Sequence, residues 1–186
     1  MVIQKILQIL SVGLVLVTNS WNYAQSPVPA VHGVRNDLPQ PYETQRTWGA
    51  LPDGTASWAA VTAVEPSPDG RFIYVIHRCF ENSCEGRIEP PILKFDYEGN
   101  LLGSFGAGLF IFPHGATVDH EGSLWVTDAQ GNGESGHQVF KFSPEGDILL
   151  TLGKKGIGGS GTDLLHSPND IVVDPNDGDI FVAESH

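Results

Sequence analysis

A repeated pair of short apolar stretches constrains the fold of this chain more than any other sequence feature. Residues 112–128 contain two such stretches on either side of a Glu121-Gly122 turn, and residues 167–184 repeat the pattern at an offset of 55. A weaker copy lies upstream, in residues 61–76. The stretches are apolar in blocks, with no clean alternation, which is typical of strands packed on both faces of a sheet.

A second repeated pair lies between these copies. Residues 92–102 match residues 139–149 at an offset of 47, and both contain a Glu-Gly turn at the same point. Each repeating unit therefore holds four short strands separated by glycine turns. Units of about 40–50 residues with four strands each are typical of the blades of a β-propeller. The sequence predicts an all-β propeller, with about two and a half blades in residues 58–186.

The number of repeats bears on the extent of the chain. A propeller needs about four or more blades to close its ring, and an open stack would leave apolar faces and strand edges exposed to water. We therefore expect the chain to be the N-terminal part of a longer propeller, truncated at its C-terminus. The alternative is a complete small β-protein.

The first 24 residues have the pattern of an export signal. Lys5 is their only charged residue, residues 6–17 form an apolar core, and Ala24 offers a small residue for cleavage. The core is too short for a membrane span, although a membrane anchor is the alternative. We expect a signal peptide in residues 1–24 and a tether rich in proline and asparagine in residues 25–57. The protein would then be secreted or periplasmic, with no membrane contact after cleavage.

The composition is acidic. The chain has 22 Asp and Glu residues against 10 Lys and Arg residues, and removal of Lys5 with the signal lowers the formal net charge from −12 to −13. The basic residues form no run, which argues against a nucleic acid as partner because phosphate binding needs clustered Lys and Arg.

The two cysteines, Cys79 and Cys84, lie five residues apart. In an exported protein such a close pair predicts a disulfide that pins a loop. A metal site would need more thiolates than this chain has.

Two side chains are candidates for a functional site. His114 opens the first strand of its repeat between a proline and a glycine, and the innermost strand of a propeller blade lines the axial channel, so we expect His114 to face this channel. A hydrogen-bonded structural histidine is the alternative. Arg78 ends a strand where the other repeats carry Asp128 or Glu184. Its guanidinium is suited to a forked bond with a carboxylate, and the alternative is a salt bridge to one of these two acids.

The repeat resembles the NHL class of propellers and, more closely, the lyase half of the peptidylglycine α-amidating enzymes. The resemblance covers residues 58–186 and rests on Pro113-His-Gly-(x)3-Asp119-(x)2-Gly-(x)2-Trp-Val-Thr-Asp128, His137-Gln-Val-Phe-Lys141, Pro168-(x)-Asp170-(x)-Val172-(x)-Asp174 and His77-Arg78. It implies a six-bladed propeller with a central zinc held by three histidines. It also implies cleavage of a peptidyl-α-hydroxyglycine to a peptide amide and glyoxylate.

Residue by residue, the resemblance implies five roles. His114 falls on a zinc ligand, and Arg78 on the arginine that faces the substrate. Ala116 and Thr62 fall on positions whose backbone carbonyls bind a structural calcium. The catalytic tyrosine of the family is replaced by His186, the remaining candidate for the base. The alternative function is a non-catalytic NHL-repeat propeller that binds a protein or a small ligand.

Overall fold

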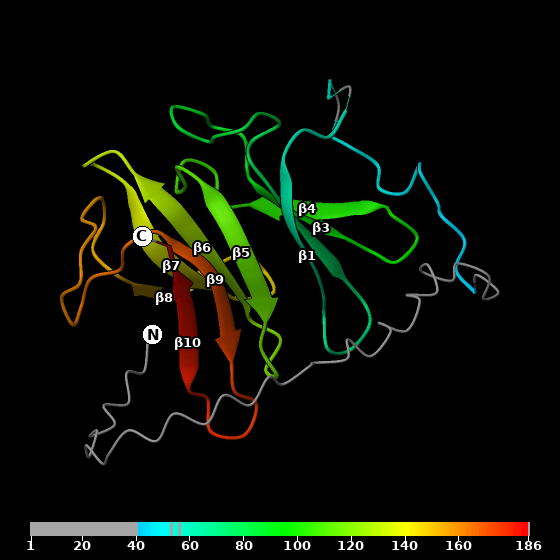
Figure 1. Ribbon diagram of the computed structural model, residues 1–186. Helices are drawn as coiled ribbons and strands as arrows, with labels where there is room; N and C mark the ends of the chain where they lie inside the picture. The colour runs from blue at the N-terminus through cyan, green and yellow to red at the C-terminus, as the bar shows by residue number, and fades with distance from the viewer. Residues whose placement is uncertain (1–40, 53, 56, 186) are drawn as a thin grey trace, which may run out of the picture. The chain divides into compact units, whose positions relative to one another are not determined.

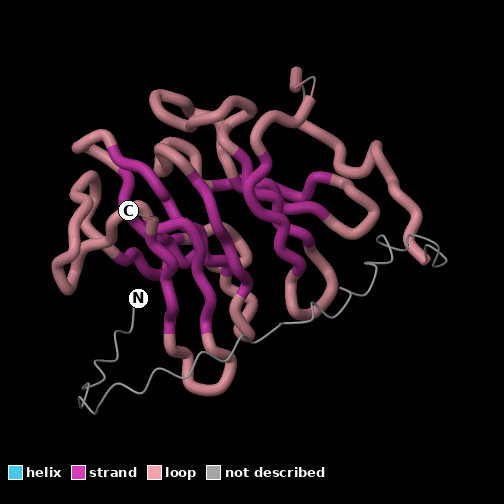
Figure 2. Tube along the Cα trace, viewed as in Figure 1, coloured by secondary structure: helices cyan, strands magenta, loops and turns pink. Residues whose placement is uncertain are grey.

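The computed structural model describes residues 41–52, 54, 55 and 57–185. The predicted signal peptide, most of the predicted tether and the candidate base His186 lie outside these residues. Residues from 45 onward form one compact unit, and residues 41–44, which precede it, are exposed and have no regular secondary structure. The described part contains strands and loops but no helix (Figure 2). It therefore includes no helix that could cross a membrane.

The described strands form two complete sheets and one strand pair, all antiparallel (Figure 1). Each sheet follows the chain order of its strands. The first contains β1 (Val61–Pro66), β2 (Ile73–His77), β3 (Ile92–Phe95) and β4 (Leu101–Phe105). The second contains β5 (Pro113–Val118), β6 (Leu124–Gly131), β7 (Gly136–Phe142) and β8 (Ile148–Leu152). The pair consists of β9 (Pro168–Val173) and β10 (Ile180–Glu184). The predicted all-β fold of consecutive four-stranded blades is confirmed.

Aspartate side chains close the hairpins between the first two strands of a blade. The Asp119 carboxylate accepts N–H bonds from Glu121 and Ser123, at 3.0 and 2.9 Å. Gly122 completes this turn with a φ of 86°, a left-handed conformation that glycine adopts at little cost. Asp174 accepts the N–H of Asn176 in the equivalent turn of the third blade. These bonds explain why an acid follows the first strand in two of the repeats.

Apolar side chains fill the space between neighbouring sheets. The core between the first and second sheets is mainly aromatic and aliphatic and contains Tyr74, Ile76, Ile92, Phe110, Leu124, Val126, Phe140 and Phe142. Trp125, Val139 and Ile171 pack between the second sheet and β9. Burying each large side chain contributes about 2 kcal/mol relative to exposure, so the blades stabilise one another through their faces.

The two outer faces of this stack differ. Trp48 and Trp58 cover the first sheet, and the Trp48 ring lies 5.4 Å from that of Phe95. On the other side, the repeat aligns Phe181 of β10 with Trp125 of β6, which is buried, but Phe181 is 58% exposed. The reason is that no further strand of the described residues covers this face of β10.

The inner strands β1, β5 and β9 approach one another closely, and Gly115 marks the tightest point. A Cβ atom at this position would lie 2.6 Å from Oδ1 and 2.7 Å from Cα of Asp170. We expect Gly115→Ala to lower the free energy of unfolding by about 1–3 kcal/mol, because backbone atoms of β9 would have to move. Urea unfolding of the whole protein measures the change.

Gly103→Ala is the matched control for this substitution. Gly103 lies in β4, and a Cβ atom there would have no neighbour within 4 Å. The control should leave stability unchanged or raise it slightly. Equal stabilities of the two variants would contradict the close approach of β5 and β9.

Candidate active site at the inner strands

The three inner strands line one open cavity of about 540 Å³. β1 contacts β5, and β5 contacts β9, so residues far apart in the sequence meet along this line. The cavity is lined by side chains and backbone from all three strands, among them Thr62, Glu65, His114, Ala116 and Asp170. Three of the residues singled out in the sequence, Thr62, His114 and Ala116, therefore share one cavity.

His114 is half-buried at the start of β5, and a neighbouring blade orients its ring. Its Nδ1 lies 3.0 Å from the backbone oxygen of Asn169, the residue at the same position of the next repeat. A carbonyl oxygen can only accept, so Nδ1 has to carry the proton of this bond. Nε2 is then the nitrogen with a free electron pair. Metal-binding histidines are commonly oriented in this way, by a carbonyl on the other ring nitrogen.

Irregular pairing exposes the backbone beside this histidine. The register between β5 and β6 shifts between Pro113 and Ala116, and that between β1 and β2 shifts between Val61 and Ala63. Thr62 lies within the second shift. Such bulges re-aim side chains and carbonyls at the end of a strand. The cavity is thus lined at equivalent points of two blades by backbone that departs from regular strand pairing.

Arg78 lies directly after β2 and stacks on an aromatic ring of the neighbouring blade. The central carbon of its guanidinium lies 3.4 Å from the ring centroid of Phe112. Its Nε–H donates to the Pro113 carbonyl at 3.4 Å, and an Nη1–H donates to Oδ1 of Asn82 at 2.9 Å. Partial burial lowers the pKa of Arg78, but a guanidinium stays charged at neutral pH.

Arg78 is not among the residues that line the cavity of the inner strands, but the ring of Phe112 lies near both predicted site residues. Its ring centroid lies 6.2 Å from that of His114 and 3.4 Å from the central carbon of the Arg78 guanidinium. The alternative of a salt bridge from Arg78 to Asp128 or Glu184 is not realised, because no carboxylate of the described residues forms an ion pair with Arg78. Glu184 instead accepts the N–H of His166.

Asp128 holds the segment that carries Phe112. Its fully buried carboxylate accepts the N–H of Ile111 at 3.0 Å and that of Phe112 at 2.6 Å. Burial raises the pKa of Asp128 to about 6, and the two backbone bonds limit this shift. Whereas Asp119 and Asp174 bind N–H groups of their own turns, Asp128 lies within β6 and binds the segment that leads into the neighbouring strand β5.

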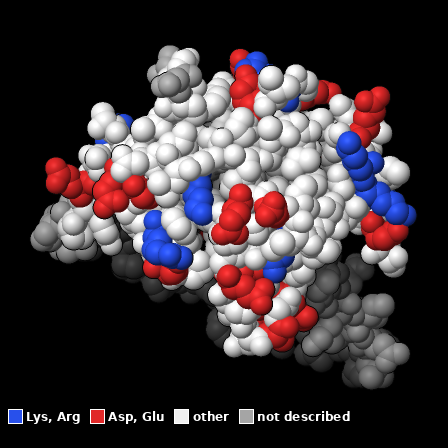
Figure 3. Space-filling view, turned by 180° about the vertical axis from the view of Figure 1, so that it is seen from behind, with Lys and Arg blue, Asp and Glu red and all other residues white. Residues whose placement is uncertain are grey.

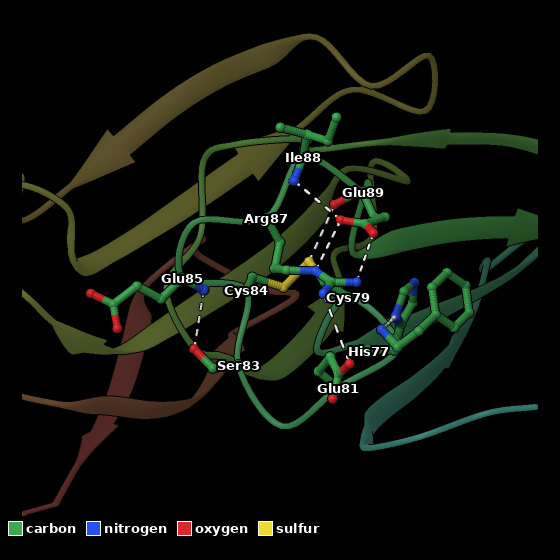
Figure 4. Close-up of polar contacts among 10 residues, drawn as sticks. His77, Cys79, Glu81, Ser83, Cys84, Glu85, Arg87, Ile88 and Glu89 are labelled. Atoms are coloured by element: carbon green, nitrogen blue, oxygen red, sulfur yellow. Dashed lines mark hydrogen bonds and ion pairs between the residues drawn. A yellow bond between two sulfur atoms is a disulfide. The ribbon is translucent and has the colours of Figure 1, made fainter.

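A disulfide joins Cys79 and Cys84 directly after Arg78 (Figure 4). Their Cα atoms lie 5.2 Å apart, and both side chains are buried. The disulfide predicted from the spacing is therefore present in the structure. Neighbouring His77 is fully buried, and burial lowers its pKa to about 4, so this histidine is neutral at pH 7.

Two acids in the cavity were not recognised in the sequence. Burial raises the pKa of Glu65, and the negative charge of Asp170 raises it further. The repeat aligns Glu65 with Asp119, a turn residue, but the structure keeps Glu65 within β1, paired with Tyr74. The repeat could have indicated that Asp170 lies in the cavity. Asp170 directly follows Asn169, the counterpart of His114, and so aligns with Gly115.

The described residues contain no cluster of three or more His, Cys, Asp or Glu side chains that could hold a metal ion. His114 supplies one imidazole. The cavity has more oxygen donors than imidazoles, because its lining includes the acids Glu65 and Asp170 as well as Thr62 and Ala116. A hard cation such as Ca²⁺ takes oxygen ligands of these kinds.

Sequence comparison relates the chain to two groups of proteins, although no family model matches it. Peptidyl-alpha-hydroxyglycine alpha-amidating lyase 1 of Drosophila melanogaster is 31% identical over 184 residues, which cover 89% of this chain and 32% of the relative. Lyase 2 of the same organism is 30% identical over 189 residues, which cover 92% of this chain and 43% of the relative. NHL repeat-containing protein 3 of Homo sapiens is 34% identical over 100 residues, or 51% of this chain and 28% of the relative.

The chain is thus homologous to the α-amidating lyases over most of its length and to NHL repeat proteins over about half of it. It spans less than half the length of each of these relatives. The predicted resemblance to both groups is confirmed at the level of sequence.

The raised pKa of Asp128 leads to a pH-dependent prediction. Between about pH 4 and pH 6 the folded state binds more protons at Asp128 than the unfolded state, so its contribution to stability falls as the pH rises. We expect the stability of the wild type relative to Asp128→Asn to fall by roughly 2 kcal/mol from pH 4 to pH 7. Unfolding free energies at several pH values test this.

The wild type has to be compared with Asp128→Asn because titration of His77 changes the stability with pH in the opposite direction. Its lowered pKa makes stability rise with pH between about pH 4 and pH 6.5. The wild-type curve contains both effects, whereas the difference from Asp128→Asn isolates the carboxylate. A difference that is constant with pH would contradict a buried carboxylate that titrates in this range.

Proposed function

We propose that the whole protein is an exported zinc-dependent lyase. It would cleave a peptidyl-α-hydroxyglycine, or a related hydroxy-acid derivative, to an amide and glyoxylate. The observation that carries this proposal is the meeting of His114 and Arg78, from neighbouring blades, at the ring of Phe112. The homology to α-amidating lyases supports it.

His114 is suited to hold zinc through Nε2, because the Asn169 carbonyl engages Nδ1. The family resemblance implies two further histidine ligands, which the described residues do not supply. When bound, zinc would supply a Lewis acid that polarises the hydroxyl group of the substrate and lowers its pKa. His114 contributes an oriented ring that loses little freedom on binding the metal.

Arg78 is suited to hold the carboxylate of the glycine unit. Its known partners are neutral, so its positive charge is available to a substrate. A forked pair between guanidinium and carboxylate fixes orientation as well as position. Arg78 would thereby align the carbon–nitrogen bond that breaks.

The proton balance of the cleavage requires a base. The hydroxyl group loses its proton as the carbonyl of glyoxylate forms, the carbon–nitrogen bond breaks, and the amide nitrogen takes up a proton. The family resemblance assigns the base to the position of His186, where this chain has an imidazole in place of a phenol. With an ordinary pKa near 6.5, a histidine can accept and return a proton near neutral pH.

A structural calcium would bind at the cavity between the inner strands. Ala116 and Thr62 would supply backbone carbonyls, and the nearby carboxylates of Glu65 and Asp170 add negative charge to the cavity. Calcium would tie two blades together at their inner strands. Such oxygen ligands of mixed kind are common for calcium.

An exported protein fits the disulfide between Cys79 and Cys84, since such bonds persist in oxidising compartments. The signal peptide in residues 1–24 and a secreted or periplasmic location are part of this proposal. Figure 3 shows acidic and basic side chains in small mixed groups on one face of the molecule.

Two substitutions test the proposal in the whole protein. We expect His114→Ala to lose bound zinc, because it removes a ligand. Arg78→Ala should keep zinc and lose turnover by on the order of 100-fold or more, because it removes only the carboxylate partner. Metal analysis and the release of glyoxylate from a peptidyl-α-hydroxyglycine are the two measurements.

The controls are His120→Ala and Arg71→Ala, which alter an exposed turn histidine and an exposed arginine paired with Asp69. Both should keep zinc and activity. If the wild type holds no zinc and releases no glyoxylate, the lyase proposal fails. A non-catalytic propeller that binds a protein or a small ligand then becomes the better account.

A further inference from the structure

We propose that the disulfide-closed loop of residues 79–84, here called the clasp, is a positioning device that holds Arg78 without neutralising its charge. Asn82 and Phe112 are the positioning residues of this device. The inference rests on the proposed function for the role of Arg78 as the carboxylate anchor. It concerns which groups fix this anchor and why they are uncharged.

The backbone after Arg78 adopts a conformation that needs outside support. Cys79 and Phe80 both have positive φ, 51° and 59°, in the left-handed region. For residues other than glycine this region costs about 1–2 kcal/mol each. Two such residues in succession persist only where the surroundings impose them. They reverse the chain so that Asn82 returns to the side chain of Arg78.

Three kinds of contact impose this reversal. The disulfide closes the loop from Cys79 to Cys84. The Phe80 ring lies 4.2 Å from that of His77, and the Phe80 N–H donates to Nδ1 of the same histidine at 3.1 Å. The Glu81 N–H donates to the Arg78 carbonyl at 2.8 Å. Neutral His77 thus anchors the clasp to the end of β2.

The far end of the clasp is bonded to the segment that carries Phe112. The Cys84 N–H and the Ser83 hydroxyl both donate to the Ile111 carbonyl, at 2.9 and 3.0 Å. Ile111 precedes Phe112, whose ring lies against the guanidinium. The clasp therefore fixes Asn82 on one side of Arg78 and helps to fix the aromatic ring on another.

The charges around the clasp are arranged so that none neutralises Arg78. Arg87 pairs with Glu89 at 2.7 Å and with Glu81, an acid within the loop, at 3.8 Å (Figure 4). Glu85, which directly follows the loop, accepts an N–H of the Asn132 side chain at 2.9 Å. Arg78 is held by an amide oxygen, a carbonyl oxygen and an aromatic face. A guanidinium held in this way is oriented in advance and keeps its charge for an anionic ligand.

Asn82→Asp separates this role from a merely structural one. The substitution keeps an oxygen where the Arg78 N–H donates, so the loop retains its bond, but it adds a charge that competes with the substrate carboxylate. We expect KM to rise by about 10-fold or more, with zinc content and thermal stability unchanged. Asn82→Ala should raise KM less, because it loosens Arg78 without neutralising it. The exposed Gln45→Glu is the control for the added charge.

A second measurement does not depend on turnover. Phenylglyoxal modifies arginine, and mass spectrometry of the digested protein gives the rate at Arg78 with and without glyoxylate. We expect glyoxylate to protect Arg78 in the wild type and in Gln45→Glu, and to protect it at about 10-fold higher concentration in Asn82→Asp. In the double variant Cys79→Ser/Cys84→Ser, which lacks the disulfide, glyoxylate should no longer protect Arg78 from modification.

The outcomes distinguish the two proposals. Protection in the wild type without any release of glyoxylate from substrate would overturn the lyase proposal and leave the clasp in place. Equal protection and equal KM in the wild type and Asn82→Asp would overturn the clasp. Because Asn82→Asp leaves the disulfide intact, this test holds even if the double cysteine variant fails to fold.

Discussion

Face-to-face packing of neighbouring sheets is the interaction on which the rest of the structure depends. A single four-stranded blade cannot bury both of its apolar faces, and the aromatic core around Phe110, Phe140 and Phe142 exists only because two sheets meet. This packing brings the inner strands so close that only glycine fits at position 115. The same approach places the Asn169 carbonyl on the ring of His114 and the ring of Phe112 under Arg78. The site is thus a product of packing between blades, with Arg78 at the end of β2, Phe112 and His114 at the start of β5, and Asn169 in β9.

The repeat predicted the strands, the hairpins and the mouth position of His114, because these depend on local spacing and turn chemistry. The disulfide followed from spacing as well. The partners of Arg78 could not be read from the sequence, since Phe112 and Asn82 reach it through a blade contact and a reversal of the chain. Glu65 was hidden by its alignment with a turn aspartate. Alignment with the buried Trp125 would place Phe181 in the core, but Phe181 is exposed, because burial depends on what covers a strand and not on the strand itself.

The basic side chains of the described residues fall into two kinds of environment. Arg71, Arg87 and Lys141 are paired with carboxylates. Such pairs contribute little to stability at the surface, but they leave no charge free for a ligand. Arg78 and Lys94 have neutral partners instead, and both are partly buried, which costs stability unless an anion binds. Lys94 donates to the Pro144 carbonyl at 2.8 Å and lies 3.9 Å from the ring centroid of Phe72. Arg78 differs from Lys94 because its aromatic partner, Phe112, also lies near the oriented imidazole of His114, which supports the proposal that Arg78 binds a small anion.

The central claim is that His114 and Arg78 act on the same small molecule. Paramagnetic relaxation tests it directly: cobalt(II) replaces zinc in the whole protein, and the relaxation of the carboxylate carbon of ¹³C-labelled glyoxylate is measured. The account predicts strong relaxation by the bound cobalt in the wild type, and its loss in Arg78→Ala although cobalt remains bound. Undiminished relaxation in Arg78→Ala, or none in a cobalt-loaded wild type, would contradict a site shared by the two residues.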